Sequence, residues 1–283
     1  MIQYLYLGRV GYGDGLRLQA ELVRLRQAGR VENTLLLLEH PAVLTLGRNA
    51  KRANVLATDE LLAAGGVELH EIDRGGDVTY HGPGQLVGYP IFDLRSLRNP
   101  VSGRRLGPVD FVRLMEEALI RVCAVYGVPA KRIPGLTGVW CPPDGRVLDE
   151  SSGNRPASEG KIAAIGIHVS RGVTSHGFAF NVTTDLRDFE LIVPCGIADH
   201  PVTSLEKEIL GKEIAAGAAQ IPSLEEVGEQ AARQFGLVLN EQVLAVESLA
   251  ALRAQSFPAE DTPVQVPGEV RRLLEPNGPK IRA

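Results

Sequence analysis

The segment from Lys161 to Val182, "KIAAIGIHVSRGVTSHGFAFNV", constrains the fold of this chain more than any other stretch. Two runs of alternating side chains flank Arg171-Gly172, a residue pair suited to a two-residue hairpin turn. The turn fixes the register of both strands, because side chains alternate between the two faces of a strand. The predicted cross-strand pairs are Gly166 with Gly177, Ala164 with Ala179, Ile165 with Phe178, and Ala163 with Phe180.

This register predicts a ribbon with two unlike faces. One face carries isoleucine and phenylalanine and suits a hydrophobic core, whereas the other is a small-residue floor made of Ala164, Gly166, Gly177 and Ala179. Glycine opposite glycine gives up packing within the strand pair, so another group is expected against that backbone. Two alternatives remain open, an apolar ligand chain or a neighbouring element that packs closely.

The composition indicates a globular protein, and the length suits one large domain or one domain plus an appendage. Of 283 residues, 44% are apolar and 23% are charged, and the formal net charge is −4. This mild charge, without a dense basic stripe, argues against nucleic acid as a partner. No apolar run approaches a membrane span and no signal peptide is recognisable, so no membrane association is expected. Three cysteines do not form a disulfide framework, which favours the cytoplasm.

Local signals place the remaining elements and a domain boundary. Apolar spacing and capping residues predict helices at 15–28 (between Asp14 and Gly29), 58–65, 110–127 and 223–236, the last with a Ser223–Glu226 capping box. Apolar strands are expected on either side of His40-Pro41. We expect a catalytic domain at 1–239 and a C-terminal extension at 240–283, helical at 240–255 and then loosely ordered. Residues 141–158 are expected to form a surface loop.

A glycine-rich segment, "RGGDVTYHGPGQ" at 74–85, matches neither a phosphate loop nor a dinucleotide-binding fingerprint. Four glycines beside arginine, aspartate and histidine describe a backbone that can approach a ligand closely. An irregular loop without a ligand would have the same composition.

The third unusual stretch, "LIVPCGI", places Cys195 between proline and glycine on a probable turn. The thiol could be a buried apolar side chain, a metal ligand together with His200, or a nucleophile. As a nucleophile it would need a nearby cation to lower its pKa from about 8.5. The candidate cations are His81, His176, His200, Lys161 and Arg74. By contrast, Cys123 and Cys141 are expected to be structural.

Together, "RGGDVTYHGPGQL", "GKIAAIGIHVSRGVTSHGFAFNV" and "LIVPCGI" resemble the signatures of lipoyl(octanoyl) transferases. This family is also called octanoyl-[acyl-carrier-protein]:protein N-octanoyltransferases or lipoate-protein ligase B. The likeness covers residues from about 35 to about 210, including "TLGRNAKRANVL". It implies an α+β fold of the biotin/lipoate protein ligase type, in which helices back a mixed β-sheet. The longer loop at 141–158 and the segment beyond 239 depart from the family.

The resemblance also implies roles for individual residues. Cys195 corresponds to the cysteine that forms an acyl-thioester, and Lys161 to the lysine that lowers the pKa of that cysteine and transfers protons. No proton-transfer role is expected for His81 or His176, and an alternative is that both only orient loops through hydrogen bonds. The implied substrate-binding residues are Arg74, Gly75, Gly76, Asp77, Val78, Thr79, Tyr80 and His81, with Ala164, Ile165, Gly166, Gly177, Phe178 and Ala179.

The position of Lys161 conflicts with ideal strand alternation. Counting from the turn, Lys161 falls on the face of Ile165 and Ile167, away from the small-residue floor. A twist or a bulge at the start of the strand would have to redirect it.

The implied reaction moves an octanoyl group from octanoyl-acyl carrier protein to a lysine of a lipoyl domain, with no cofactor and no ATP. The acceptors would be the lipoyl domains of 2-oxoacid dehydrogenases and the glycine cleavage H protein. Two alternatives remain, an ATP-dependent lipoate or biotin ligase and a non-catalytic acyl-binding protein of the same fold. The presence of both Cys195 and Lys161 speaks against the latter.

Overall fold

The hairpin at 160–181 forms with the predicted register in the computed structural model, which describes residues 1–143, 158–194, 200–213 and 220–256. Strands β9 (Gly160–Ser170) and β10 (Val173–Asn181) pair antiparallel. All four predicted cross-strand pairs are confirmed. The turn residues Arg171 and Gly172 have φ angles of 49° and 86°, as a two-residue turn of this hand requires.

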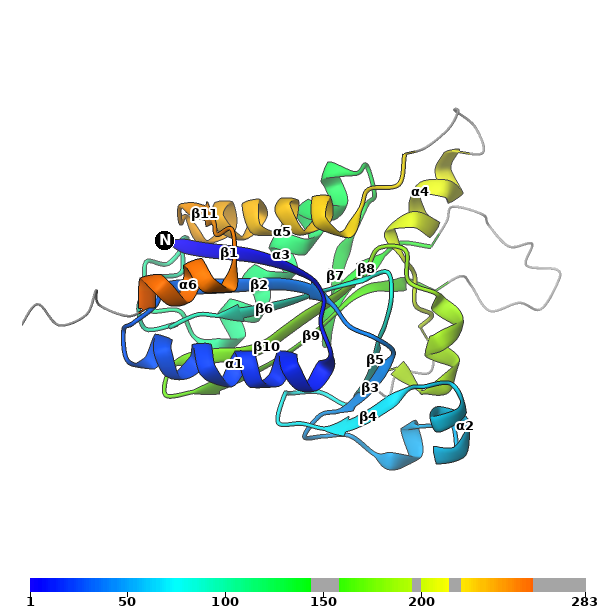
Figure 1. The fold of residues 1–283 in the computed structure, drawn as a ribbon. Coiled ribbons are helices and arrows are strands. Elements are labelled where there is room, and N and C mark those ends of the chain that lie inside the picture. The colour runs from blue at the N-terminus through cyan, green and yellow to red at the C-terminus, as the bar shows by residue number, and fades with distance from the viewer. Residues whose placement is uncertain (144–157, 195–199, 214–219, 257–283) are drawn as a thin grey trace, which may run out of the picture.

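Eight strands build the main sheet in the order β11-β1-β2-β6-β10-β9-β8-β7 (Figure 1). Strand β1 pairs parallel with β2 and β11, whereas β2, β6, β10, β9, β8 and β7 pair antiparallel, so the sheet is mixed. A second sheet has the order β4-β3-β5. The bounds are β1 Ile2–Arg9, β2 Asn33–Glu39, β3 Val43–Leu46, β4 Glu68–Glu71, β5 Val78–His81, β6 Gln85–Ile91, β7 Lys131–Ile133, β8 Leu136–Cys141 and β11 Val243–Ala245.

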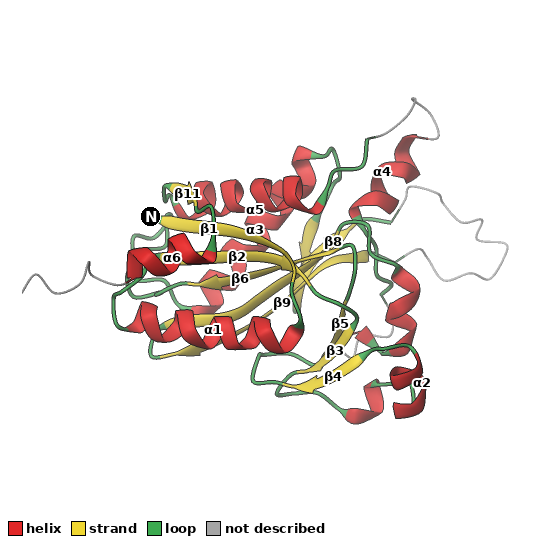
Figure 2. Cartoon of the chain, viewed as in Figure 1, coloured by secondary structure: helices red, strands yellow, loops and turns green. Residues whose placement is uncertain are grey.

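Helices cover both faces of the main sheet (Figures 1 and 2). Helices α3 and α5 pack on one face, over a core that includes Phe92, Phe178 and Phe180. Helices α1 and α6 cover the other face and bury Leu36 and Leu38. The helix bounds are α1 Tyr12–Gln27, α2 Asp59–Ala64, α3 Pro108–Val125, α4 Leu205–Glu213, α5 Leu224–Leu239 and α6 Leu249–Ser256, with 3₁₀ turns η1 Arg52–Asn54 and η3 Leu186–Leu191. No helix in the described part of the chain is long and apolar enough to cross a bilayer.

Two helices start earlier than predicted, and in both the N-cap residue is a glycine, which has no side chain to cap the helix. Helix α1 begins at Tyr12, so Asp14 lies in its first turn and forms an ion pair with Arg17 instead of capping the helix. Helix α3 likewise begins at Pro108, because proline suits the first helical turn. Helix α2, predicted from Thr58, begins at Asp59, and the hydroxyl group of Thr58 caps it by accepting a hydrogen bond from the amide of Leu61.

Helix α5 has the predicted capping box, with hydrogen bonds in both directions between Ser223 and Glu226. It does not end at Gly236 but continues to Leu239, and Asn240 adopts the left-handed conformation that closes it. Gly236 serves close packing, because a Cβ atom there would lie 2.3 Å from Cγ2 of Val243.

The expected helix at 240–255 is wrong for the first part of this range. Residues 243–245 form β11, which pairs with β1 at the edge of the main sheet. Helix α6 follows and buries Leu252 in the core beside α1. The boundary at 239 stays a prediction, although β11 and α6 join the sheet and core of the preceding residues. The expected tail from 257 and most of the expected loop at 141–158 lie outside the described residues.

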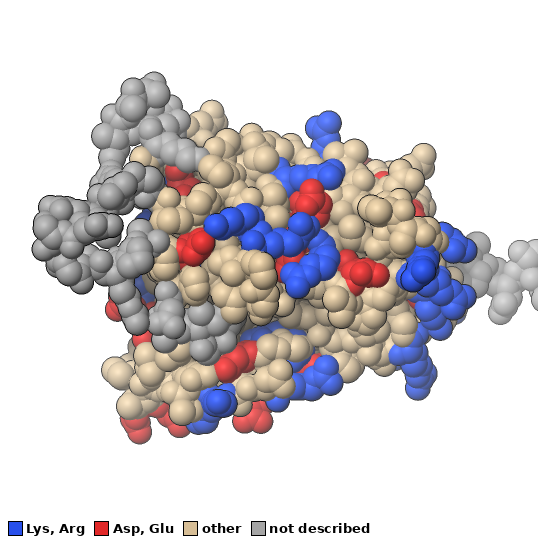
Figure 3. Space-filling view, turned by 180° about the vertical axis from the view of Figure 1, so that it is seen from behind, with Lys and Arg blue, Asp and Glu red and all other residues tan. Residues whose placement is uncertain are grey.

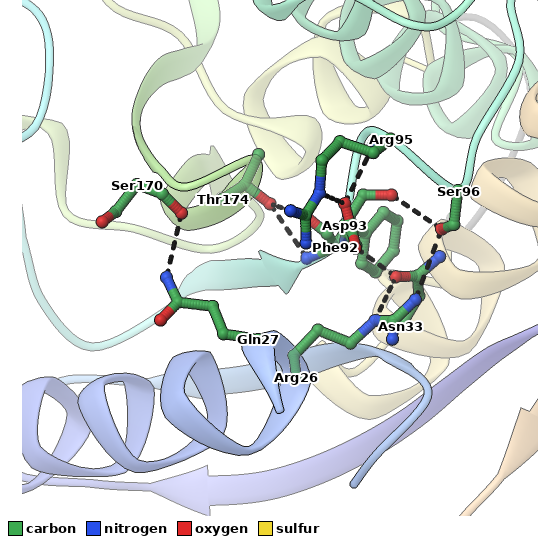
Figure 4. Close-up of polar contacts among 9 residues, drawn as sticks. All are labelled: Arg26, Gln27, Asn33, Phe92, Asp93, Arg95, Ser96, Ser170 and Thr174. Carbon is green, nitrogen blue, oxygen red and sulfur yellow. Dashed lines mark hydrogen bonds and ion pairs between the residues drawn. The ribbon is translucent and has the colours of Figure 1, made fainter. Parts of the chain in front are cut away.

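A polar network anchors the hairpin turn to the rest of the sheet (Figure 4). Asn33 Oδ1 accepts hydrogen bonds from Arg26 Nε and from the amide of Asp93, at 2.9 and 2.8 Å. Arg95 forms a two-point ion pair with Asp93 and lowers the pKa of that carboxyl group. The hydroxyl group of Thr174 accepts from the amide of Phe92, which connects β10 to the end of β6. Through Thr174 the start of β10 is held against the segment that follows β6.

Candidate active site

The small-residue floor lies at the bottom of a cleft beside the first residue of α1. The cleft holds about 480 Å³ of empty space. Of the predicted binding residues, eleven line it: Arg74, Gly76, Asp77, Thr79, His81, Ala164, Ile165, Gly166, Gly177, Phe178 and Ala179. Four other lining residues were not predicted as ligand-binding: Tyr12, Val87, Tyr89 and His176.

The glycines and the alanines of the floor have different surroundings. Neighbouring backbone packs closely against the glycines, whereas the alanines line the cleft. A Cβ atom on Gly177 would lie 2.1 Å from the carbonyl oxygen of Gly88, and one on Gly166 would lie 2.6 Å from that of Gly75. The alternative of a closely packing neighbour is therefore confirmed at the two glycines, and a ligand chain over the floor stays a prediction. The glycines admit neighbouring backbone, while Ala164 and Ala179 line open space.

The predicted glycine-rich loop packs over this floor through buried polar contacts. Arg74 is 8% exposed, and its guanidinium group donates to the carbonyl and hydroxyl oxygens of Thr45, at 2.8 and 2.9 Å. The amide of Gly75 donates to the carbonyl oxygen of Ile167 at 3.0 Å and ties the loop to β9. Asp77 accepts from Asn54 Nδ2 at 2.6 Å. The arginine is thus fixed at the edge of the cleft.

Two predicted binding residues of this loop point away from the cleft. Val78 and Tyr80 are almost fully buried in the small core under the second sheet, because β5 alternates its side chains. The hydroxyl group of Tyr80 donates to Asp188 at 2.6 Å. Their neighbours Thr79 and His81 face the cleft instead. Residues that are consecutive in the motif therefore point to opposite sides of β5, and only every second one faces the cleft.

A cluster of neutral aromatic side chains forms one end of the cleft. The rings of Tyr12, His40 and His81 lie 5.0 to 6.1 Å apart, and His40 Nε2 lies 2.7 Å from the hydroxyl oxygen of Tyr89. Burial, with smaller contributions from His40 and Arg74, lowers the pKa of His81 to about 3. Burial also lowers the pKa of His40 and raises that of Tyr89. These rings are therefore uncharged near neutral pH, which suits an apolar ligand.

The buried His81 predicts a loss of stability in mild acid. Below its ordinary pKa of 6.5 the unfolded chain takes up a proton on His81 and the folded chain does not, so acid favours unfolding. We expect the stability difference between wild type and His81→Gln to change by ~2 kcal/mol between pH 6 and pH 4.5, to the disadvantage of wild type. Urea unfolding across this range measures it. Parallel pH profiles for the two proteins would contradict the expectation.

His176 interrupts the regular strand next to the cleft. Its φ angle is 55°, an uncommon conformation for a residue other than glycine, and it is held by two contacts. Its amide donates to Gln19 Oε1 of α1, and its Nε2 atom donates to Asp73, each at 2.7 Å. His81 correspondingly bonds Gln85 at 2.7 Å. The alternative that both histidines orient loops through hydrogen bonds agrees with these contacts.

A β-bulge decides the position of Lys161. Val139 pairs with Ala163 and Trp140 with Lys161, so two adjacent residues of β8 oppose three of β9. Because Val139 and Trp140 point to opposite faces, Lys161 lies on the face opposite to Ala163, which is the face of the small-residue floor. The conflict between strand alternation and the predicted role of Lys161 is thereby resolved.

Lys161 and Pro194 line a second hollow that adjoins the cleft. The hollow and the cleft share Thr79, Ala164 and Ala179 as lining residues. Lys161 is only 7% exposed, and its amide donates to the carbonyl oxygen of Pro201 at 2.8 Å. The predicted nucleophile Cys195 follows Pro194 directly but lies outside the described residues. The hollow therefore connects the floor to the residue that precedes the cysteine.

The other two cysteines are buried in the main core, as expected for structural residues. Cys123 lies in α3 and Cys141 ends β8, and both are fully inaccessible. His200, the possible metal-ligand partner, packs its ring 5.1 Å from that of Trp140. Among the residues that the structure describes, no three histidine, cysteine or acidic side chains converge to hold a metal ion.

Known proteins are similar to this chain in sequence and in fold. Residues 12–236 match the family model of the lipoyl protein ligase A/B catalytic domain. An octanoyltransferase of Acidobacterium capsulatum is 59% identical over 248 residues, which make up 88% of this chain and 94% of that protein. The chain belongs to the octanoyltransferase family. Proteins of this family are acyltransferases, so the prediction of an acyltransferase is confirmed.

Further relatives support membership of the octanoyltransferase family. An octanoyltransferase of Koribacter versatilis is 54% identical over 97% of this chain and 98% of that protein. Among solved structures, a lipoate-protein ligase A bound with ATP is similar with a TM-score of 0.60 at 16% identity, covering 90% of this chain and 93% of that chain. A bipartite lipoate protein ligase of Thermoplasma acidophilum has a TM-score of 0.57 at 18% identity, with coverages of 90% and 91%. The predicted lipoate-ligase type of α+β fold is confirmed.

Proposed function

We propose that this octanoyltransferase-family protein transfers an octanoyl group from octanoyl-acyl carrier protein to a lysine of a lipoyl domain. The acyl group passes through a thioester on Cys195, and Lys161 moves the protons. The acceptors are the lipoyl domains of 2-oxoacid dehydrogenases and the glycine cleavage H protein, and the reaction takes place in the cytoplasm without ATP.

The bulge in β9 is the observation that carries this proposal. It turns Lys161 toward the floor side, where the side chain lines one hollow with Pro194, Ala164 and Ala179. A cationic side chain next to the segment that bears a cysteine is the arrangement that activates a thiol nucleophile. Two observations therefore support the proposed dyad. Lys161 lines the hollow, and Pro194, which lines it too, directly precedes Cys195 in the sequence.

The cleft suits the acyl chain. From the hollow at Lys161, Ala164 and Ala179 lead to a region lined by Val87 and by the rings of Tyr12 and Tyr89. These side chains exclude water from an alkyl chain, and the neutral histidines beyond them add no charge. We infer that the octanoyl chain lies over the alanines with its carbonyl group near Lys161.

The chemistry proceeds in two balanced steps. In the first, the Cys195 thiolate attacks the thioester carbonyl, and the carrier protein leaves as a thiolate that takes a proton from the Lys161 ammonium group. In the second, the acceptor lysine attacks the new thioester, its proton passes to Lys161, and the Cys195 thiolate leaves. The first step exchanges one thioester for another at nearly equal free energy. The second step forms an amide, which is lower in free energy, so the two steps together need no nucleotide.

A nucleotide-free transfer assay tests this function. The protein is mixed with octanoyl-acyl carrier protein and a lipoyl domain, and intact mass follows both the protein and the acceptor. We expect one octanoyl group on the protein within the first turnover and then on the acceptor lysine, with no effect of added ATP. Transfer that requires ATP and free octanoate or lipoate would instead indicate a ligase. Binding of octanoate with no turnover in either assay would indicate an acyl-binding protein.

A further inference from the structure

We propose that Trp140 is a positioning residue, whose ring holds the ammonium group of Lys161 in the hollow that Lys161 and Pro194 line, an inference that rests on the proposed function. Trp140 is the only tryptophan of the chain and is fully buried in β8. The Lys161 Nζ atom lies 4.9 Å from the centre of its ring. This distance falls within the range of a cation–π contact, for which tryptophan offers the strongest ring.

The bulge that redirects Lys161 also creates this contact. It pairs Lys161 with Trp140 across the two strands, so both side chains project from the same face. The aliphatic stem of the lysine lies against β8, because a Cβ atom on Gly138 would come within 2.9 Å of Lys161 Cε. Gly138 and Trp140 lie two residues apart on that face and form a cradle for the stem and then for the charged end.

The cradle is rigid because β8 is fixed from the opposite side. The amide of Gly138 donates to Glu116 at 3.0 Å, and this fully buried carboxylate is paired with Arg113 at 2.7 Å and Arg132 at 3.2 Å. On the molecular surface, basic and acidic side chains are interspersed, as one face shows in Figure 3. The Trp140 ring also packs against the His200 ring in a T-shaped pair.

The ring face, and not a hydrogen bond, is what Trp140 offers to the site. Its indole N–H group makes no hydrogen bond to any described residue, although it is buried. The negative face of the ring attracts an ammonium group but has little attraction for a neutral amine. A flexible lysine side chain is thus restricted to one direction before substrate arrives, which lowers the entropy that the reaction must otherwise lose.

The single tryptophan allows a direct test. Mono-, di- and trifluorotryptophan are placed at position 140, which weakens the negative ring face in steps and leaves the ring shape almost unchanged. We expect the rate of octanoyl-thioester formation on Cys195, followed by intact mass with octanoyl-acyl carrier protein, to fall in the same steps, by about tenfold at the last. Trp140→Phe should retain more activity than Trp140→Leu. A purely structural ring would give equal rates across the fluorinated series.

Thermal unfolding and a neighbouring variant separate position from stability. The Tm should stay constant across the fluorinated series. Val139→Ala, one residue away and equally buried but on the core face, should lower the Tm and leave the rate unchanged. If the unsubstituted protein forms the thioester and all fluorinated proteins react at the same rate, the role of Trp140 is overturned and the proposed function is not. Failure of the unsubstituted protein to form any thioester would overturn the proposed function and this inference with it.

Discussion

Replacing Cys195 by alanine should abolish both the octanoyl adduct and the transfer to the lipoyl domain. The physical reason is that no other nucleophile is proposed to carry the acyl group between donor and acceptor. We expect transfer to fall below one thousandth of the wild-type rate, since losing a covalent nucleophile removes the whole two-step path. Intact mass of the protein and gel-shift or mass analysis of the acceptor measure the two effects.

The other two cysteines provide matched controls for this substitution. Cys123 and Cys141 are fully buried in the main core and line neither the cleft nor the hollow. Cys123→Ala and Cys141→Ala should therefore still form the adduct, with a modest loss of stability from the smaller side chain. An undiminished adduct on the Cys195→Ala protein would refute the proposed nucleophile.

Replacing Lys161 by methionine should slow acyl transfer about 10²- to 10⁴-fold, the usual effect of removing a general acid–base group. Methionine keeps the unbranched stem that packs against Gly138 but carries no charge. Without the cation, the thiolate should form only near the ordinary cysteine pKa of about 8.5, so the residual rate should rise toward alkaline pH. Single-turnover acylation measured from pH 6 to pH 9.5 tests both effects.

Arginine at the same position separates the two roles of Lys161. Lys161→Arg keeps a positive charge but cannot release a proton at these pH values. We expect it to retain part of the acylation step and to lose the later transfer to the acceptor lysine. Lys131→Met serves as the control, because Lys131 is half exposed on β7 and pairs with Glu159. Full activity of the Lys161→Met protein would contradict the dyad.

The hairpin shows how far local sequence can predict this fold. The Arg171-Gly172 turn and the period of two determine the pairs at 163–166 and 177–180, and every predicted pair is present. Turn geometry and side-chain alternation act within a few residues, so these four pairs follow from the hairpin alone. The same holds for the Ser223 capping box, where two residues of one helical turn satisfy each other.

Elsewhere the outcome depended on segments far apart in the chain. The local sequence predicts that α5 ends at Gly236, but the helix continues to Leu239. The glycine is needed there because the side chain of Val243 in β11 occupies the space that a Cβ atom would take. The glycines of the floor could not be interpreted locally either. Their neighbours Gly75 and Gly88 come from other parts of the sheet and loop, and only packing brings those backbones within reach.

By itself, the sequence determined the hairpin, the unlike faces of its strands, and the motifs that indicate the family. Only the tertiary structure decided that Lys161 faces the floor. The bulge forms through pairing with β8, where the partner of Lys161 is Trp140, 21 positions earlier in the chain (161 − 140). The tertiary structure also decided that Trp140 lies under the lysine and that Val78 and Tyr80 turn away from the cleft. Alternation is a property of one strand, whereas a bulge and a ring contact need two strands in register.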